Sequence, residues 1–384
     1  MRDGASKPAA AAPTGREPDR SLWDGRWQQP LHGLGRRNTL LMALPFALGA
    51  CGVWLFLKLG LPLPWFLGSM AAVMVATFVR LPVERAGFIA LPLRTLIGFT
   101  VGTSFTPGLL DRIGGMTASL LVMIPLTYAI VALGMWVFQR FAGFDRPTSF
   151  FAAVPGGLND MVLMAGDAGA QERSVTLAHI TRIFVVICTL PLFIQYGLGY
   201  QITRGSVTRL RLAQLTPHDA VIILAIAVGG YLLARRLKIA GAPVIGPMVL
   251  SALAHITGLT TARMPVEMMN VAQLGLGVLL GCRFKGITVK ELTTIVSVSA
   301  VFSLAILLLS AAVAGLVHTA LGIPMLSVLL AYAPGGQTEL LLIALVLGLD
   351  APYVALHHLM RLFTVIIGAQ MVFRRAAWTK SGGG

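Results

Sequence analysis

A Pro-Gly-Gly triplet interrupts an apolar stretch of this chain twice, at 155–157 and at 334–336. Proline lacks an N–H and clashes with the preceding helical turn, and glycine leaves helical angles easily, so an ordinary helix cannot run through either triplet. Inside a bilayer, the backbone groups that such a break frees need partners in the protein or in a water-filled cavity. The triplets therefore predict broken helices beside a binding site.

The composition indicates a membrane protein. Hydrophobic residues make up 56% and charged residues 12% of the 384 residues, which excludes an ordinary soluble globular domain. A bilayer-spanning helix needs roughly 17–25 apolar residues, and the sequence predicts an all-α, polytopic helical membrane protein. We expect its apolar segments at about 39–58, 62–79, 86–105, 116–138, 148–165, 174–198, 219–236, 242–259, 265–283, 293–317, 323–347 and 351–373.

The charge pattern indicates membrane orientation and no nucleic-acid surface. The net charge is +15, but the lysines and arginines gather near the ends of the chain and in short loops. This is typical of topology signals, here in a multi-pass protein of the bacterial inner (plasma) membrane. We expect a disordered cytoplasmic tail at 1–37, a membrane repeat at 38–200, a linker at 201–218, a second repeat at 219–376 and a short tail at 377–384.

The two triplets belong to an internal duplication. Pro334 follows Pro155 by 334 − 155 = 179 residues, and 151–187 aligns with 330–366 at that offset without a gap. Two such repeats predict one functional unit whose site lies where the repeats meet. The aligned pairs include Gly169 and Gly348, His179 and His358, and Arg182 and Arg361.

Small residues recur at the same offset. The motif Gly98-x-x-x-Gly102 matches Gly277-x-x-x-Gly281. Glycines four residues apart on a helix allow another helix to approach closely. We therefore expect tight helix packing at both motifs.

The loop charges bear on how the repeats are oriented. If every segment crosses the membrane, the repeats are parallel and the basic loop residues divide about evenly between its two sides. If each Pro-Gly-Gly segment enters and returns on one face, each repeat has five spanning helices and the repeats are inverted. Arg235, Lys238, Arg283 and Lys285 are then cytoplasmic. The positive-inside tendency favours the inverted arrangement, and the sequence leaves open whether the broken segments cross or turn back.

Two carboxylates lie five residues after the prolines, Asp160 and Glu339. An ionisable group within the membrane is costly and faces a cavity or a partner. We interpret both as coupling-ion or proton sites; alternatively, arginines neutralise them only to hold helices together. We expect a substrate or ion site made of Pro155, Gly156, Gly157, Asn159, Asp160, His179, Arg182, Pro334, Gly335, Gly336, Gln337, Thr338, Glu339, His358 and Arg361.

A histidine and an arginine three residues apart follow each break, His179 with Arg182 and His358 with Arg361. Each pair shares one helix face. The arginines would hold an anionic substrate or act as counter-ions of the carboxylates, and the histidines would relay protons. The alternative is structural, with arginines in buried ion pairs and histidines bonded to backbone carbonyls. Arg94, which has no matching arginine in the second repeat, is either an anion contact or an interfacial side chain.

The doublet His357-His358 raises the question of a metal. Adjacent helical residues point about 100 degrees apart, and no H-x-x-x-H or H-E-x-x-H motif accompanies the doublet. Cys51, Cys188 and Cys282 stand at unrelated spacings. We expect no metal and no cofactor.

At these residues the sequence resembles the AbrB family of membrane proteins, whose members carry the labels regulator of gene expression and ammonia monooxygenase. The resemblance rests on Pro155–Asp160, Pro334–Glu339, the histidine-arginine pairs and the segment Ala242–Met248. It covers about residues 40–375 and implies a duplicated membrane domain.

A more distant resemblance concerns transporters. Val154–Gly157 followed by Asn159 is similar to the broken helix of bile-acid sodium symporters, and 61–72 followed by 95–105 is similar to the early helices of cation/proton antiporters. These likenesses imply inverted repeats with crossed broken helices. The symporter serine before the asparagine is missing here, so sodium coupling does not carry over.

We expect a secondary transporter or permease, and not an enzyme. It would move a small solute, with an anion as one option, coupled to protons or sodium. A membrane protein that affects the regulation of gene expression and a metal-dependent, ammonia monooxygenase-like enzyme stay open as alternatives. The expected partners are the lipid bilayer and a small-molecule or ion substrate, with no nucleic acid; a homodimer stays open.

Overall fold

The computed structural model describes residues 36–84, 86–199, 210–239 and 241–375. The predicted tail 1–37, apart from its last two residues, the linker residues 201–209 and the predicted tail 377–384 lie outside the described residues. Asn159 and Asp160 belong to the described backbone, whereas their side chains lie outside the described part.

Every regular element in these ranges is a helix, as the composition predicts. The α-helices are α1 (Arg36–Lys58), α2 (Ser69–Phe78), α3 (Ala90–Gly102), α4 (Gly108–Phe141), α5 (Arg146–Ala153), α6 (Leu158–Asp167), α7 (Glu172–Leu192), α8 (Pro217–Arg236), α9 (Ala242–Ile256), α10 (Val266–Gly281), α11 (Val289–Glu291), α12 (Ser297–Leu321), α13 (Met325–Tyr332), α14 (Gln337–Val346) and α15 (Ala351–Arg375). Short π- and 3-10-helical turns are η2 (Pro64–Gly68), η3 (Gly87–Ile89), η4 (Phe193–Gly197), η6 (Leu212–Gln214), η7 (Cys282–Phe284) and η8 (Leu292–Val296).

Five helical stretches in the described part are long and apolar enough to cross a membrane. They carry exposed large apolar side chains, such as Trp54, Leu224 and Leu308, which suits contact with lipid. This agrees with the prediction of a multi-pass helical membrane protein. The stretches are Leu41–Lys58, Gly114–Phe141, Glu172–Gly197, Pro217–Arg236 and Val289–Leu321.

Each Pro-Gly-Gly triplet lies between two short helices. α5 ends at Ala153 and α6 begins at Leu158, while α13 ends at Tyr332 and α14 begins at Gln337. The residues that follow α5 and precede α6 have ψ angles of 125° and 128°, which are extended values that a helix cannot contain. The second pair of helices has the bounds of the first shifted by 179 residues, since 153 + 179 = 332 and 158 + 179 = 337.

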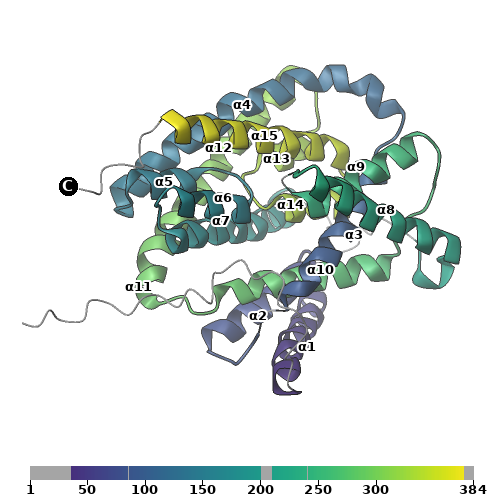
Figure 1. Cartoon of the computed structure of the whole chain (residues 1–384), viewed down its shortest axis with the longest axis horizontal. Coiled ribbons are helices and arrows are strands. Elements are labelled where there is room, and N and C mark those ends of the chain that lie inside the picture. The colour runs from purple at the N-terminus through teal and green to yellow at the C-terminus, as the bar shows by residue number, and fades with distance from the viewer. Residues whose placement is uncertain (1–35, 85, 200–209, 240, 376–384) are drawn as a thin grey trace, which may run out of the picture.

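Helices from the two halves of the sequence pack against each other, α3 with α9 and α2 with α10 (Figure 1). A methyl group at Gly98 of α3 would overlap the Val244 carbonyl oxygen of α9, and one at Gly277 of α10 would overlap the Ser69 hydroxyl at the start of α2. Each half therefore supplies one helix to each crossing. The close approach confirms the packing that the two Gly-x-x-x-Gly motifs predict.

A buried polar cluster joins α4, α13 and α15. Ser119 Oγ lies 3.1 Å from the Tyr332 hydroxyl, also contacts the Tyr353 hydroxyl, and lies 2.9 Å from His357 Nε2. His357 Nδ1 donates to the Tyr353 carbonyl at 2.8 Å, so its Nε2 accepts from Ser119. All four residues are at most 1% exposed. Because every one of these polar side chains has a partner, the cluster fixes α15 against its neighbours.

Candidate functional site

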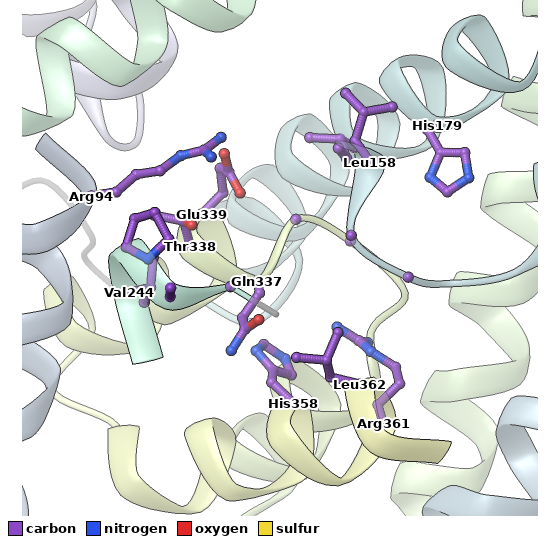
Figure 2. A pocket seen from close by; sticks show the side chains of 18 of the residues that line it. Arg94, Leu158, His179, Val244, Gln337, Thr338, Glu339, His358, Arg361 and Leu362 are labelled. Atoms are coloured by element: carbon purple, nitrogen blue, oxygen red, sulfur yellow. The ribbon is translucent and has the colours of Figure 1, made fainter. Parts of the chain in front are cut away.

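Both Pro-Gly-Gly loops line one cavity of about 550 Å³. Its other walls are the starts of α6, α9 and α14 and faces of α3, α7, α8, α10 and α15, so both halves of the sequence contribute (Figure 2). Pro334 is buried outside this lining. The predicted site residues that line the cavity are Pro155, Gly156, Gly157, His179, Arg182, Gly335, Gly336, Gln337, Thr338, Glu339, His358 and Arg361.

Arg182 binds the open end of α5. The last carbonyls of a helix have no partner within it, and Arg182 Nη1 donates to the Ala153 carbonyl at 3.0 Å while Nη2 donates to the Val154 carbonyl at 3.0 Å. Nη2 also donates to His179 Nδ1 at 2.9 Å, and His179 Nε2 donates to the Phe151 carbonyl at 2.8 Å. The two side chains of α7 thus bind the backbone carbonyls at the first break. These bonds correspond to the structural alternative for the histidine.

Arg361 holds the second break with fewer bonds. Its Nη1 donates to the Ala333 carbonyl at 2.6 Å, the one hydrogen bond that the described residues give it. His358 Nε2 donates to the Leu330 carbonyl at 3.1 Å, while His358 Nδ1 is buried without a partner in the described part. Arg361 and His358 are 4% and 1% exposed. The second copy therefore leaves polar groups available beside the cavity.

Glu339 lies in the first turn of α14, where the positive end of the helix dipole favours a carboxylate. It folds back over Gly336, since a methyl group there would overlap Glu339 Oε2. In Figure 2 the Arg94 guanidinium of α3 points toward the Glu339 carboxylate. Arg94 Nε and Gln337 Nε2 are both buried without a hydrogen-bond partner among the described residues. The cavity lining that contains this carboxylate thus also contains two donors without a described partner.

Three more cationic side chains line the cavity, and the sequence does not predict them as site residues. Arg235 and Lys238, near the end of α8, are exposed, and Arg283, after α10, is half-buried. Six lining side chains are lysine or arginine, against one carboxylate with a described side chain. The sequence shows only that these residues lie near helix ends, and basic residues there indicate how the helices are oriented in the membrane, not a binding site. Their convergence gives the cavity a positive potential that favours anions.

The histidine doublet does not point to one shared ion. His357 Nε2 accepts from Ser119, whereas His358 Nε2 donates to the Leu330 carbonyl. Among the residues that the structure describes, no group of three histidine, cysteine, aspartate or glutamate side chains could hold a metal ion. The free cysteines are Cys51, Cys188 and Cys282.

The fold and the cavity together are those of an all-helical, membrane-type protein: five helical stretches in the described part are long and apolar enough to cross a membrane, and a cavity with charged lining residues lies beside both Pro-Gly-Gly loops. The family model described as "Transition state regulatory protein AbrB" matches residues 65–377, and the chain therefore belongs to the AbrB family, as its motifs predict. It is 25% identical over 354 residues to "Uncharacterized protein YhjN" of Bacillus subtilis (strain 168), covering 86% of this chain and 91% of that protein. It is 23% identical over 325 residues to "Putative regulator AbrB" of Escherichia coli (strain K12), covering 83% of this chain and 91% of that protein.

Proposed function

We propose that this protein is a secondary transporter or permease of the bacterial inner membrane, and not an enzyme. It moves a small anionic solute with protons or sodium as the coupling ion. The observation that carries the proposal is one cavity lined by both Pro-Gly-Gly breaks. In inverted-repeat transporters, solute and coupling ions bind at such interrupted helices, where the repeats meet. The positive lining favours an anion.

Two contacts between distant loops support inverted repeats. Lys285 Nζ donates to the Glu84 carboxylate at 2.8 Å, and Gln195 Nε2 donates to the Gly60 carbonyl at 2.8 Å. With six crossings in each repeat, the members of each pair would lie on opposite sides of the membrane. With five crossings in each repeat, Glu84 and Lys285 are both cytoplasmic, and Gly60 and Gln195 are both external. Both contacts therefore favour the inverted arrangement over parallel repeats with six crossings.

A third contact supports a broken element that returns to the face it enters. The backbone N–H of Gln171, just before α7, donates to Thr148 Oγ1 in the first turn of α5 at 3.0 Å. The start of α5 and the residues after α6 therefore lie together. This fits a re-entrant element of α5 and α6, and five spanning helices in the first repeat.

In this arrangement the cavity opens toward the cytoplasm. Arg235 lies in the last turn of α8, which would end on the cytoplasmic side, and Lys238 lies two residues after that helix. Arg283 lies two residues before Lys285 of the cytoplasmic pair. These cations are exposed or half-buried and belong to the cavity lining. Transport then requires a second conformation that exposes the same site to the other side, with Glu339 and Asp160 as the ion or proton sites.

Gradient-driven flux in liposomes tests this function. We expect the purified protein to drive uptake of a labelled anion under a proton or sodium gradient, with carboxylates and phosphate tried singly. Glu339→Gln and Asp160→Asn should abolish this flux, because neither amide can carry the coupling charge. Glu84→Gln, in an exposed loop, is the matched control and should retain flux. Unchanged flux in the folded Glu339 and Asp160 variants would refute the assignment.

The family description and the name of the Escherichia coli relative favour a second candidate, a membrane protein that affects gene expression. Complementation separates the two. A strain that lacks this protein is first tested for altered gene expression. If that alteration follows from loss of transport, the transport-deficient Glu339→Gln variant should not restore normal expression. Restoration by that variant would favour a direct regulatory role. Stoichiometric copper or iron in the purified protein would instead favour the oxygenase.

A further inference from the structure

The two arginines of the repeated pair have different bonds. Arg182 uses both terminal nitrogens on the Ala153 and Val154 carbonyls. Arg361 makes one bond in the described part of the chain, from Nη1 to the Ala333 carbonyl, while it lines the cavity. A guanidinium has five N–H donors. Arg361 therefore retains donors for a ligand at the cavity wall, whereas the terminal nitrogens of Arg182 are occupied.

His358 offers the complementary group, a hydrogen-bond acceptor. Its Nε2 donates to the Leu330 carbonyl, so Nδ1 of the neutral ring carries a lone pair. In the first repeat the same lone pair of His179 accepts from Arg182. In the second, Nδ1 is buried and has no partner among the described residues. Because buried polar atoms are nearly always paired, this lone pair fits a ligand that carries a hydroxyl.

Gln337 adds a donor that the first repeat lacks. The equivalent position, 337 − 179 = 158, is Leu158. Gln337 Nε2 is buried and has no partner among the described residues, and in Figure 2 the amide points toward the His358 ring. An amide N–H and a guanidinium on one side of a cavity can each donate to an oxygen of a carboxylate. The acceptor and both donors thus come from the second repeat.

The charge along the cavity favours a ligand with more than one negative charge. Arg235 and Lys238 of the lining are exposed, and Arg361 is 4% exposed. Such a series of cations steers anions inward and raises their local concentration. A single carboxylate would leave most of this positive charge unbalanced, and a dianion would balance more of it.

We infer that Arg361, Gln337 and His358 form a subsite for a small hydroxylated dicarboxylate. One carboxylate accepts hydrogen bonds from Arg361 and Gln337, the neighbouring hydroxyl donates to His358 Nδ1, and the second carboxylate faces the remaining cations of the lining. Passage of this anion across the membrane rests on the proposed function, whereas its binding rests on the geometry alone.

Calorimetric titration of the full-length protein in detergent tests the subsite, with malate, succinate and inorganic phosphate as probes. Malate has the hydroxyl that succinate lacks. We expect malate to bind about five- to tenfold more tightly than succinate, the factor for one hydrogen bond to a buried acceptor, and more tightly than phosphate. Equal affinities for malate and succinate, or tighter binding of phosphate, would overturn the assignment.

Two variants test the groups singly and spare the bonds that hold the fold. Gln337→Leu introduces the residue found at position 158, so the protein should fold and lose about tenfold in malate affinity. His358→Lys keeps a donor for the Leu330 carbonyl and carries no acceptor in place of Nδ1, so malate and succinate should bind equally. Gln139→Leu, at an exposed position of α4 outside the cavity lining, is the matched control and should leave malate affinity unchanged. An unchanged malate affinity in folded Gln337→Leu would also overturn the assignment.

Binding and transport can fail separately. Malate binding without gradient-driven malate flux would refute the transport function and leave the subsite intact. Flux of another anion without malate binding would refute the subsite and leave the transport function intact.

Discussion

Replacing Arg182 by alanine is expected to lower the free energy of unfolding by on the order of 3 kcal/mol, since an unsatisfied buried polar group costs about 1–3 kcal/mol. Arg182 is 3% exposed and donates to the Ala153 and Val154 carbonyls and to His179 Nδ1. Its loss removes these partners at the end of α5, beside the first break. Thermal unfolding in detergent measures the effect as a lowered midpoint.

The matched variant is Arg361→Ala, at the equivalent position of the second repeat. Arg361 has one such bond in the described part of the chain, to the Ala333 carbonyl. We therefore expect a loss of stability less than half as large, together with a much greater loss of anion binding. Equal destabilisation by the two substitutions would contradict the asymmetry between the repeats.

The substitution Gly277→Ala should destabilise the protein by roughly 2–3 kcal/mol, at the upper end of overpacking effects. The added methyl group would overlap the Ser69 hydroxyl and the Phe66 carbonyl oxygen, and neither α10 nor α2 can move without disturbing the crossing. Unfolding by denaturant or heat measures the change.

Gly315→Ala provides the control for this substitution. Gly315 lies within α12, and a methyl group there would meet no atom within 4 Å. Alanine is favoured over glycine in a helix by about 1 kcal/mol, so this variant should be neutral or slightly more stable. A similar loss in both variants would mean that the glycine crossing does not limit helix packing.

The helix breaks follow from residue types alone. Proline and two glycines within the apolar segment predicted at 148–165 require an interruption, and α5 and α6 end and begin on either side of the triplet. The family also follows, because the paired motifs are specific enough to identify it. These features depend on local backbone chemistry and on repeated spacing, which a sequence displays directly.

The partners of Arg182 could not be predicted in the same way. Its spacing from His179 places both side chains on one face of α7, but spacing does not distinguish a carboxylate from a carbonyl as the nearest acceptor. A break leaves the last carbonyls of the preceding helix without partners, and these carbonyls attract the guanidinium. The same three-dimensional dependence explains why the lining role of Arg235, Lys238 and Arg283 is absent from the sequence pattern.

We infer that the two breaks line one water-filled cavity that is reached from the cytoplasm. Labelling of a single cysteine tests it, in a protein whose three native cysteines have been replaced. Gln337→Cys lies in the cavity lining, and Leu342→Cys, on the same helix, is fully buried. In oriented vesicles, a membrane-impermeant thiol reagent should modify the cysteine at 337 from the cytoplasmic face, should be slowed by a bound anion, and should leave the cysteine at 342 unmodified. No reaction at 337 from the cytoplasmic face, or equal reaction at both positions, would contradict a cavity that opens to the cytoplasm.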